Sequence, residues 1–265
     1  MPRRTASPAH RDQLRLAAKR FRDHEGISFG GLEKWYFRFE ECDSELALKI
    51  LRSIRYYSGL DIRVSLEALV TSVFERLHGV QRRQIFFVPV GGPGESGTVL
   101  ARALRDVPGI HKDRIVYMAE IERISPEQIS AIVFVDDFSG TGKTLETWWQ
   151  NVETMILPKA ATILVALLVV NHSARPVIEN FARLVRVHEL REEDNVLSAT
   201  SRAFDGPEKE LVLKYCRQTK CPKQYLKGFG ECALLLAFRH GCPNNSLPIL
   251  WFPDKWPRLF RRSAI

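Results

Sequence analysis

The stretch AIVFVDDFSGTGKTLET, residues 131–147, combines an apolar run, two adjacent acids and a loop rich in glycine and threonine. Ile132 to Val135 has the continuous β-branched and aromatic character of a strand buried on both faces, which a parallel sheet covered by helices requires. Asp136 and Asp137 then fall at its carboxyl end, where open α/β sheets bind ligands. We therefore predict a central strand that brings two carboxylates to a ligand site.

The loop after the acids has the composition of an anion-binding site. Its members supply backbone N–H groups, hydroxyls and one ammonium group at the start of a predicted helix. They are Ser139, Gly140, Thr141, Gly142, Lys143 and Thr144. A Walker A loop also ends in Gly-Lys-Thr, but its spacing requires a glycine where Asp137 stands. The spacing therefore disfavours an ATPase.

A second glycine-rich loop, GGPGESGT at residues 91–98, follows a predicted strand from Ile85 to Val90 and leads into a predicted helix from Val99 to Arg105. Glycines let the backbone approach a ligand closely and turn successive N–H groups toward it. The alternative is a plain Gly/Pro-rich connection between a strand and a helix. Its candidate binding residues are Gly91, Gly92, Gly94, Ser96, Gly97 and Thr98.

Strand and helix patterns alternate through residues 84–188, which predicts an α/β fold with a doubly wound, mostly parallel sheet and right-handed crossovers. Further strands are expected at 114–118, 163–170, 184–188 and 232–238. Further helices are expected at 13–24, from Asp43 or Ser44, and at 64–78, 145–156, 174–181 (capped by Ser173) and 210–216. We predict three segments: a basic arm and helical region (1–80), the α/β core (81–190) and a hood or lid (191–265).

Charge and cysteine content bound the partners and the compartment. The chain has 265 residues, 45% of them hydrophobic, and a formal net charge of +8. Basic residues gather at both ends, which favours salt-dependent contact with nucleic acid. No apolar stretch is long enough to cross a bilayer, so we expect a cytoplasmic protein without membrane contact. Five cysteines without a C-x-x-C pair favour free thiols over zinc, and no protein metal site is predicted.

The order of strand, Asp136-Asp137, apolar residue, small-residue loop and helix resembles the sugar-phosphate motif of type I phosphoribosyltransferases. The resemblance implies that Asp136 and Asp137 grip the ribose hydroxyls of phosphoribosyl diphosphate during catalysis, and that residues 139–144 cradle its 5′-phosphate. It implies that the loop at 91–98 holds the pyrophosphate. It also implies Mg²⁺ bound through the substrate diphosphate. This loop carries Glu95 where a basic residue would suit pyrophosphate better.

Two more blocks sharpen the resemblance. WYFRF at 35–39 and HGCPNNSLPILW at 240–251, together with VFVDDFSGTGKT at 133–144, resemble the phosphoribosyltransferase-like proteins of bacterial conflict (defence) systems. The resemblance implies an effector that transfers a phosphoribosyl group or cleaves an N-glycosidic bond, with a partner protein from the same operon. The family places a mobile flap near residues 119–130, and this connection is short. A regulatory module that binds a nucleotide without catalysis is therefore the alternative.

Overall fold

The computed structural model describes residues 5–92, 96–160 and 162–262. These residues divide into two compact units. One comprises residues 5–59 and 192–262, and the other comprises residues 60–191. In the part of the chain so described, no helix is both long and apolar enough to cross a membrane.

The unit at residues 60–191 is built on a parallel sheet, which confirms the predicted fold class. Its four strands lie in the order β2-β3-β4-β5. They are β2 (Ile85–Pro89), β3 (Ala131–Ser139), β4 (Thr162–Asn171) and β5 (Arg183–Leu190). Val133 pairs with Phe87 on one side and with Leu164 on the other, so β3 is an interior strand as its apolar run predicts. Each of these three side chains is buried.

The chain order reverses between β2 and β3. Ile115 makes an isolated parallel bridge with Phe87 on the β2 edge that faces away from β3. The chain therefore crosses to the outer side of β2 before it returns to form β3, and this reversal is a topological switch point. The prediction of a full strand at 114–118 is wrong. Only Ile115 and Val116 are buried there, and one neighbouring strand offers pairing for a single bridge.

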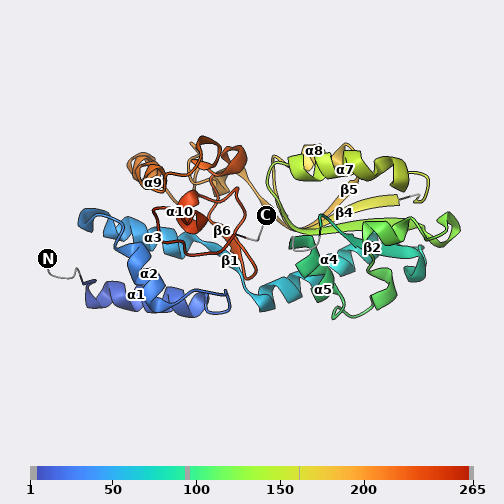
Figure 1. Cartoon of the computed structure of the whole chain (residues 1–265), viewed down its shortest axis with the longest axis horizontal. Coiled ribbons are helices and arrows are strands. Elements are labelled where there is room, and N and C mark those ends of the chain that lie inside the picture. The colour runs from blue at the N-terminus through green and yellow to red at the C-terminus, as the bar shows by residue number, and fades with distance from the viewer. Residues whose placement is uncertain (1–4, 93–95, 161, 263–265) are drawn as a thin grey trace. The chain divides into compact units, whose positions relative to one another are not determined.

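Helices cover both faces of this sheet (Figure 1). They are α4 (Gly59–Arg76), α5 (Ser96–Leu104), α6 (Met118–Ile121), α7 (Lys143–Ile156) and α8 (Arg175–Glu179). Phe86, Ile132 and Phe134 share a core with Leu145 and Trp149 of α7. On the other face, the Phe74 ring of α4 meets the Phe87 ring edge-on. Right-handed crossovers that run in opposite directions place α5 and α7 on opposite faces.

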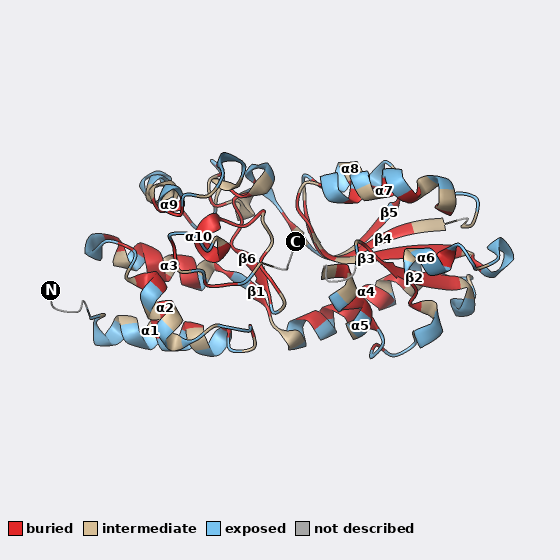
Figure 2. Cartoon of the chain, in the orientation of Figure 1, coloured by how far each residue is buried: buried red, intermediate tan, exposed pale blue. Residues whose placement is uncertain are grey.

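The unit at residues 5–59 and 192–262 is mainly helical. Its elements are α1 (Pro8–Arg20), α2 (Phe29–Tyr36), α3 (Ser44–Ser53), β1 (Arg55–Tyr57), α9 (Gly206–Gln218), β6 (Leu236–Phe238) and α10 (Pro248–Trp251). β1 and β6 pair in parallel, so the two distant chain segments share one small sheet. Figure 2 shows buried inner faces and exposed outer faces on these helices. Trp35 donates its indole N–H to the Ile249 carbonyl at 2.7 Å within the aromatic core.

The Pro-Asn-Asn-Ser segment at residues 243–246 forms a turn whose side chains bond the backbone of other segments. Asn245 donates to the Phe229 carbonyl at 2.9 Å, and the Ser246 hydroxyl donates to the Leu236 carbonyl at 2.7 Å. Both side chains are buried. They therefore satisfy backbone groups of their own unit. The lid role proposed for residues 191–265 stays a prediction.

Some predicted boundaries change. The first helix begins at Pro8 behind a Ser7 cap and ends at Arg20. Helix α8 is shorter than predicted, and Ala174 rather than Ser173 precedes it without a side-chain cap. The strand expected at 232–238 is reduced to Leu236–Phe238, because Ala233 has a φ of 43° that interrupts extended backbone.

The buried His24 should make the stability of the unit at residues 5–59 and 192–262 depend on pH. The Arg261 N–H donates to Nε2 at 3.0 Å, so this nitrogen carries no proton, and Nδ1 donates to the Phe238 carbonyl at 3.2 Å. Burial lowers the pKa of His24 below its ordinary value. The unfolded ring takes up a proton near pH 6.5 while the folded ring resists it, so the free energy of unfolding should fall as pH drops through about 6.5.

Urea titrations between pH 8 and pH 5 measure this effect. His24→Gln should flatten the pH dependence, whereas His78→Gln, at an exposed site, should leave it unchanged. An unaltered pH slope in His24→Gln would contradict the assignment.

Candidate functional site

The acid pair lies at the carboxyl end of β3, beside the end of β2. The Val90 N–H donates to the Val135 carbonyl at 3.0 Å, so the two strands stay paired up to the acids. Asp137 is only 7% exposed, and Asp136 is half-buried. The switch point between β2 and β3 therefore coincides with the predicted site.

Helix α5 approaches this strand end unusually closely, and Gly97 permits the approach. A Cβ atom at position 97 would lie 2.3 Å from the Val90 carbonyl oxygen and 3.2 Å from the Val135 carbonyl oxygen. Both neighbours are backbone atoms, which cannot rotate away as a flexible side chain can. Any side chain at this position would push the first turn of α5 away from the sheet.

Ser96 is the first residue of α5, and it connects the loop at residues 91–98 to the acid pair. Its hydroxyl donates to Asp136 Oδ1 at 2.7 Å, and the Asp137 N–H donates to the same oxygen at 2.9 Å. Two donors therefore fix one carboxyl oxygen of Asp136. Ser96 was predicted as a substrate-binding residue, and in this structure its hydroxyl holds Asp136.

The acids interact electrostatically. Burial and the adjacent Asp137 carboxylate raise the pKa of Asp136 well above its ordinary value, and the bonds from Ser96 and the Asp137 N–H oppose that rise. A perturbed acid pair at a strand end is typical of functional sites.

The loop after the acids presents backbone donors at the start of α7. Gly142 precedes this helix in the left-handed conformation, with a φ of 78°, and supplies no capping side chain. Within the described part of the chain, the N–H groups of Thr141, Gly142 and Thr144 donate to no acceptor. The Lys143 N–H lies 3.5 Å from Thr141 Oγ1, the limit of a hydrogen bond. Free amides at a helix N-terminus suit an anion.

The turn between β4 and α8 supports this loop, which the sequence did not predict. The Ser173 hydroxyl donates to the Gly140 carbonyl at 3.0 Å. A Cβ atom on Gly142 would lie 2.8 Å from the Val177 Cβ, so the loop packs tightly on the residues around α8. Sequence pattern assigned Ser173 to a helix cap, because a bond across 33 residues leaves no local signal. Ser139 and Gly140 are buried, whereas Lys143 and Thr144 are exposed.

The structure describes only part of the glycine-rich loop at residues 91–98. Gly94, like Pro93 and Glu95, lies outside the described residues. Gly91 has a φ of 88°, which favours glycine, and the Thr98 hydroxyl donates to the Gly92 carbonyl at 3.0 Å. The structure thus brings Ser96 and Gly97 to the acid pair, while Thr98 closes its own loop. Pyrophosphate binding by this loop stays a prediction.

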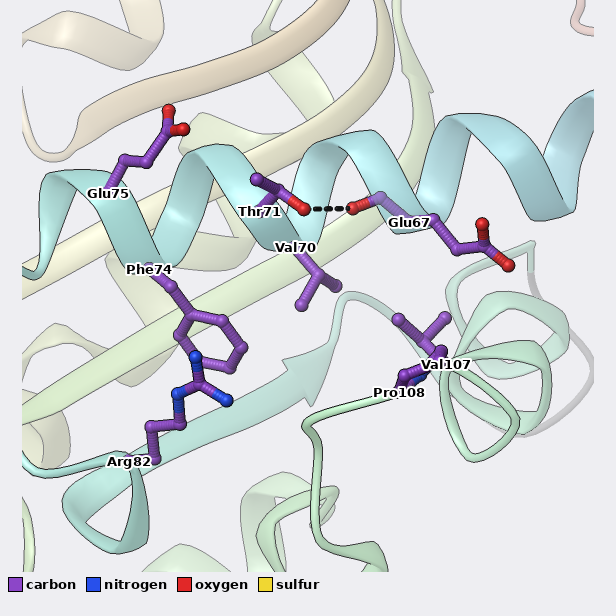
Figure 3. Close-up of a pocket in the computed structure, with 8 residues that line it drawn as sticks. All are labelled: Glu67, Val70, Thr71, Phe74, Glu75, Arg82, Val107 and Pro108. Atoms are coloured by element: carbon purple, nitrogen blue, oxygen red, sulfur yellow. Dashed lines mark hydrogen bonds between the residues drawn. The ribbon is translucent and has the colours of Figure 1, made fainter.

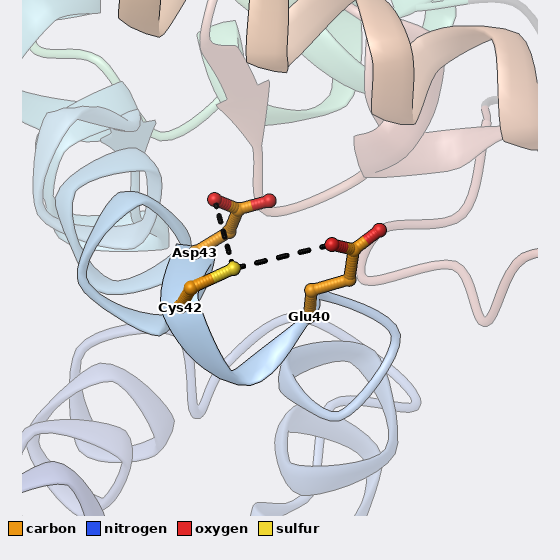
Figure 4. Close-up of side chains that lie close together, drawn as sticks. All are labelled: Glu40, Cys42 and Asp43. Carbon is orange, nitrogen blue, oxygen red and sulfur yellow. Dashed lines mark hydrogen bonds between the residues drawn. The ribbon is translucent and has the colours of Figure 1, made fainter.

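A separate group in the helical unit has the composition of a metal site. Glu40, Cys42 and Asp43 bring three ligand atoms within 4.8 Å of one another (Figure 4). Lys214 lies 2.7 Å from Glu40 and 3.4 Å from Asp43, and the Tyr215 hydroxyl also donates to Asp43. Both carboxylates therefore already have partners within the chain, and we assign no metal to this group.

One family of known proteins matches most of the chain. The PRTase-CE family model matches residues 32–262. The chain belongs to the PRTase-CE family. This match confirms the resemblance to phosphoribosyltransferase-like proteins, and it covers both compact units. No curated protein matches the chain significantly.

Solved structures with partial similarity to this PRTase-CE protein include three from bacteria and archaea. A hypothetical protein from Neisseria gonorrhoeae with bound ppGpp is 16% identical, with a TM-score of 0.38 over 52% of this chain and 85% of that chain. Orotate phosphoribosyltransferase from Aeropyrum pernix is 20% identical, with a TM-score of 0.30 over 48% and 69%. The Mycobacterium tuberculosis orotate phosphoribosyltransferase in complex with phosphoribosyl diphosphate is 14% identical, with a TM-score of 0.30 over 70% and 92%.

Gly97 should be intolerant of any side chain in this PRTase-CE protein. Gly97→Ala places a methyl group 2.3 Å from a backbone oxygen, which should destabilise the unit by about 1–3 kcal/mol. Gly92→Ala is the matched control, because a Cβ atom there meets nothing within 4 Å. Thermal and urea unfolding measure the difference. Equal stability of the two variants would show that α5 does not pack as described.

Asp136 should cost stability at neutral pH. Its pKa is raised in the folded state, so ionisation destabilises the fold increasingly as pH rises above about 4, the value for an unfolded aspartate. Asp136→Asn should therefore unfold at a higher urea concentration than the wild type at pH 7, and the advantage should shrink toward pH 4. An advantage that does not change with pH would contradict the electrostatic origin.

Proposed function

We propose that this PRTase-CE protein binds a phosphorylated ribose, as phosphoribosyl diphosphate or a nucleotide, at the carboxyl ends of β2 and β3. The observation that carries the proposal is the pairing of two chemistries at one strand end. The acid pair lies near the carboxyl end of β3. The amides of residues 141–144 follow in the connection to α7 and in its first turn. Carboxylates accept bonds from ribose hydroxyls, and helix N-terminal amides bind phosphate.

In the proposed complex, each residue has a defined task. Asp137 accepts a ribose hydroxyl, while Ser96 keeps Asp136 in position beside it. Thr141, Gly142 and Thr144 donate backbone N–H groups to the 5′-phosphate, and the Thr141 hydroxyl donates a further hydrogen bond. The exposed Lys143 ammonium adds a charge to the same anion. Anchoring the phosphate orients the anomeric carbon, so that remote binding energy lowers the barrier to glycosyl transfer. The carboxylates then stabilise positive charge at that carbon.

Mg²⁺ fits this site as a companion of the substrate. Asp136 Oδ1 already accepts two hydrogen bonds, and two carboxyl groups alone supply fewer oxygens than the octahedral shell of Mg²⁺ requires. When bound through the diphosphate, Mg²⁺ neutralises the charge of the leaving group.

Removing either end of the site should weaken ligand binding. Asp137→Asn and Thr141→Ala should each reduce the affinity for ribose-5-phosphate about tenfold or more, because each alters a contact to a charged or hydrogen-bonding partner. Asp254→Asn and Thr147→Ala change the same residue types at exposed positions and should have no effect. Isothermal calorimetry measures the constants, and unchanged affinity in both site variants would show that the site is misassigned.

A second candidate function, nucleotide recognition without catalysis, is favoured by the connection between Met118 and Ser130. It forms the short helix α6 and a 3₁₀ turn at Pro126–Gln128, and Ile121 and Ile129 are buried. Lys159 donates to the Glu122 and Ile124 carbonyls at 2.9 Å. This connection is packed, whereas a catalytic flap closes over its substrate.

Labelled phosphoribosyl diphosphate, offered with candidate nucleobases, separates the two functions. Release of pyrophosphate that depends on Asp137 establishes transfer. Saturable binding without pyrophosphate release establishes recognition.

The biological setting belongs to the same proposal. A role as a bacterial defence effector, with a partner protein from its operon, rests on the resemblance of the three sequence blocks. Association with nucleic acid rests on the basic ends. On α1, Arg15 pairs with Asp12 at 2.9 Å and Arg11 with Glu33 at 3.7 Å, so fewer charges are available than the sequence suggests. The affinity for nucleic acid should still fall as salt rises.

A further inference from the structure

Two adjoining hollows lie at the amino end of β2, away from the acid pair. The first has a volume of about 540 Å³, with an apolar surface made by Val70, Val107 and Pro108, and with Glu67 and Glu75 at its rim. The second has a volume of about 180 Å³ and lies against Ile85 and Phe87 at the β2 edge. Phe74 and Arg82 line both hollows, so the two are neighbours with one shared wall.

The shared wall is a stacked pair. The Arg82 guanidinium lies 4.5 Å from the centre of the Phe74 ring, and Figure 3 shows it against that ring. A Cβ atom at Gly109 would lie 3.0 Å from Arg82 Nη1. The lack of a side chain at Gly109 therefore leaves room for the guanidinium group. Within the described ranges, Arg82 has no carboxylate partner. An arginine that stacks on an aromatic ring can still donate its N–H groups to an anion.

The smaller hollow is strongly basic. Arg83, His111 and Arg114 line it in addition to Arg82, and Asp113 is the acid among its lining residues. Asp113 lies 3.2 Å from Arg114 and 3.7 Å from His111, so one carboxylate accompanies three arginines in this hollow. Arg114 also rests on the Phe86 ring at 4.9 Å. The excess positive charge calls for an anionic ligand.

We propose that these hollows form a second ligand site that binds a nucleoside monophosphate. The phosphate occupies the smaller hollow, where the Arg82 guanidinium group binds its oxygens and Arg83 and Arg114 add positive charge. The base occupies the larger hollow, against Val70, Val107 and Pro108 and beside the stacked Arg82. Glu67, which lines the larger hollow, accepts a hydrogen bond from the exocyclic amino group of the base. A ligand with a dianionic end and a flat aromatic end matches this division of charge and apolar surface.

This site is separate from the candidate site at the acid pair. Arg82 and Arg83 precede β2, whereas the acid pair lies beyond its carboxyl end. The five residues of β2 span about 16 Å, at about 3.3 Å per residue. A nucleotide here therefore does not compete with a phosphorylated ribose, and the two sites are testable independently.

Calorimetry with AMP, CMP and inorganic phosphate on the full chain tests the proposal. At least one nucleotide should bind about tenfold or more tightly than inorganic phosphate, because phosphate alone cannot use the apolar hollow. Arg82→Gln and Arg114→Gln should each weaken that nucleotide about tenfold or more. Arg63→Gln, an exposed arginine of α4 outside both hollows, should leave this binding unchanged. Hydrogen exchange should slow at residues 82–90 and 107–116.

Phe74→Leu provides a second variant with the guanidinium intact, because it removes the ring on which Arg82 stacks and should also weaken the nucleotide. The proposal is overturned if no nucleotide binds saturably, if inorganic phosphate binds equally well, if Arg82→Gln binds as the wild type does, or if protection appears only at residues 139–145. The calorimetric loss in Asp137→Asn with ribose-5-phosphate concerns the other site alone, so failure of one assignment leaves the other standing.

Discussion

The close contact between α5 and the ends of β2 and β3 is the constraint on which the candidate site depends. Position 97 can carry no side chain, since a single carbon there would meet the Val90 carbonyl oxygen at 2.3 Å. That contact places the preceding residue, Ser96, within 2.7 Å of Asp136. A helix displaced by the width of a methyl group would lose this bond and leave Asp136 with one donor fewer. Backbone packing therefore determines the geometry of a polar site.

The polar groups of the candidate site lower the stability of the fold. Two adjacent carboxyl groups near one strand end repel each other and lose solvation, and the N–H groups of Thr141, Gly142 and Thr144 lack acceptors within the described chain. The buried sheet around them offsets this cost. β3 and β4 consist almost entirely of buried residues up to the acids, and full burial of a large apolar side chain contributes about 1.5–3 kcal/mol. A few such residues outweigh the penalty of one perturbed carboxyl group.

The sheet was predictable because its strands are buried on both faces. Ile132 to Val135 and Ile163 to Val170 are continuous apolar runs, and each became part of an interior strand, Ala131–Ser139 and Thr162–Asn171 respectively. The place of the acid pair, near the carboxyl end of β3, was predictable for the same reason, whereas ligand binding there stays a prediction. The segment at 114–118 misled because its two buried residues, Ile115 and Val116, satisfy a strand pattern locally, whereas strand formation depends on a partner.

Contacts between distant segments were beyond prediction. The Ser96–Asp136 bond joins residues 40 apart, and the Ser173–Gly140 bond joins residues 33 apart. Ser96 and Ser173 carry no local pattern that distinguishes these roles from a loop hydroxyl or a helix cap. The stacked pair of Arg82 and Phe74 likewise arises only when α4 packs on the sheet edge. Local pattern identifies strands and loops, and tertiary packing decides which side chains meet.

The most direct test of the central claim is an amide NMR titration with ribose-5-phosphate. If the loop after β3 holds the phosphate, the N–H resonances of Thr141, Gly142, Lys143 and Thr144 should move downfield together and saturate with one affinity. Saturable binding that leaves those four resonances unmoved, or the absence of binding altogether, would contradict the account.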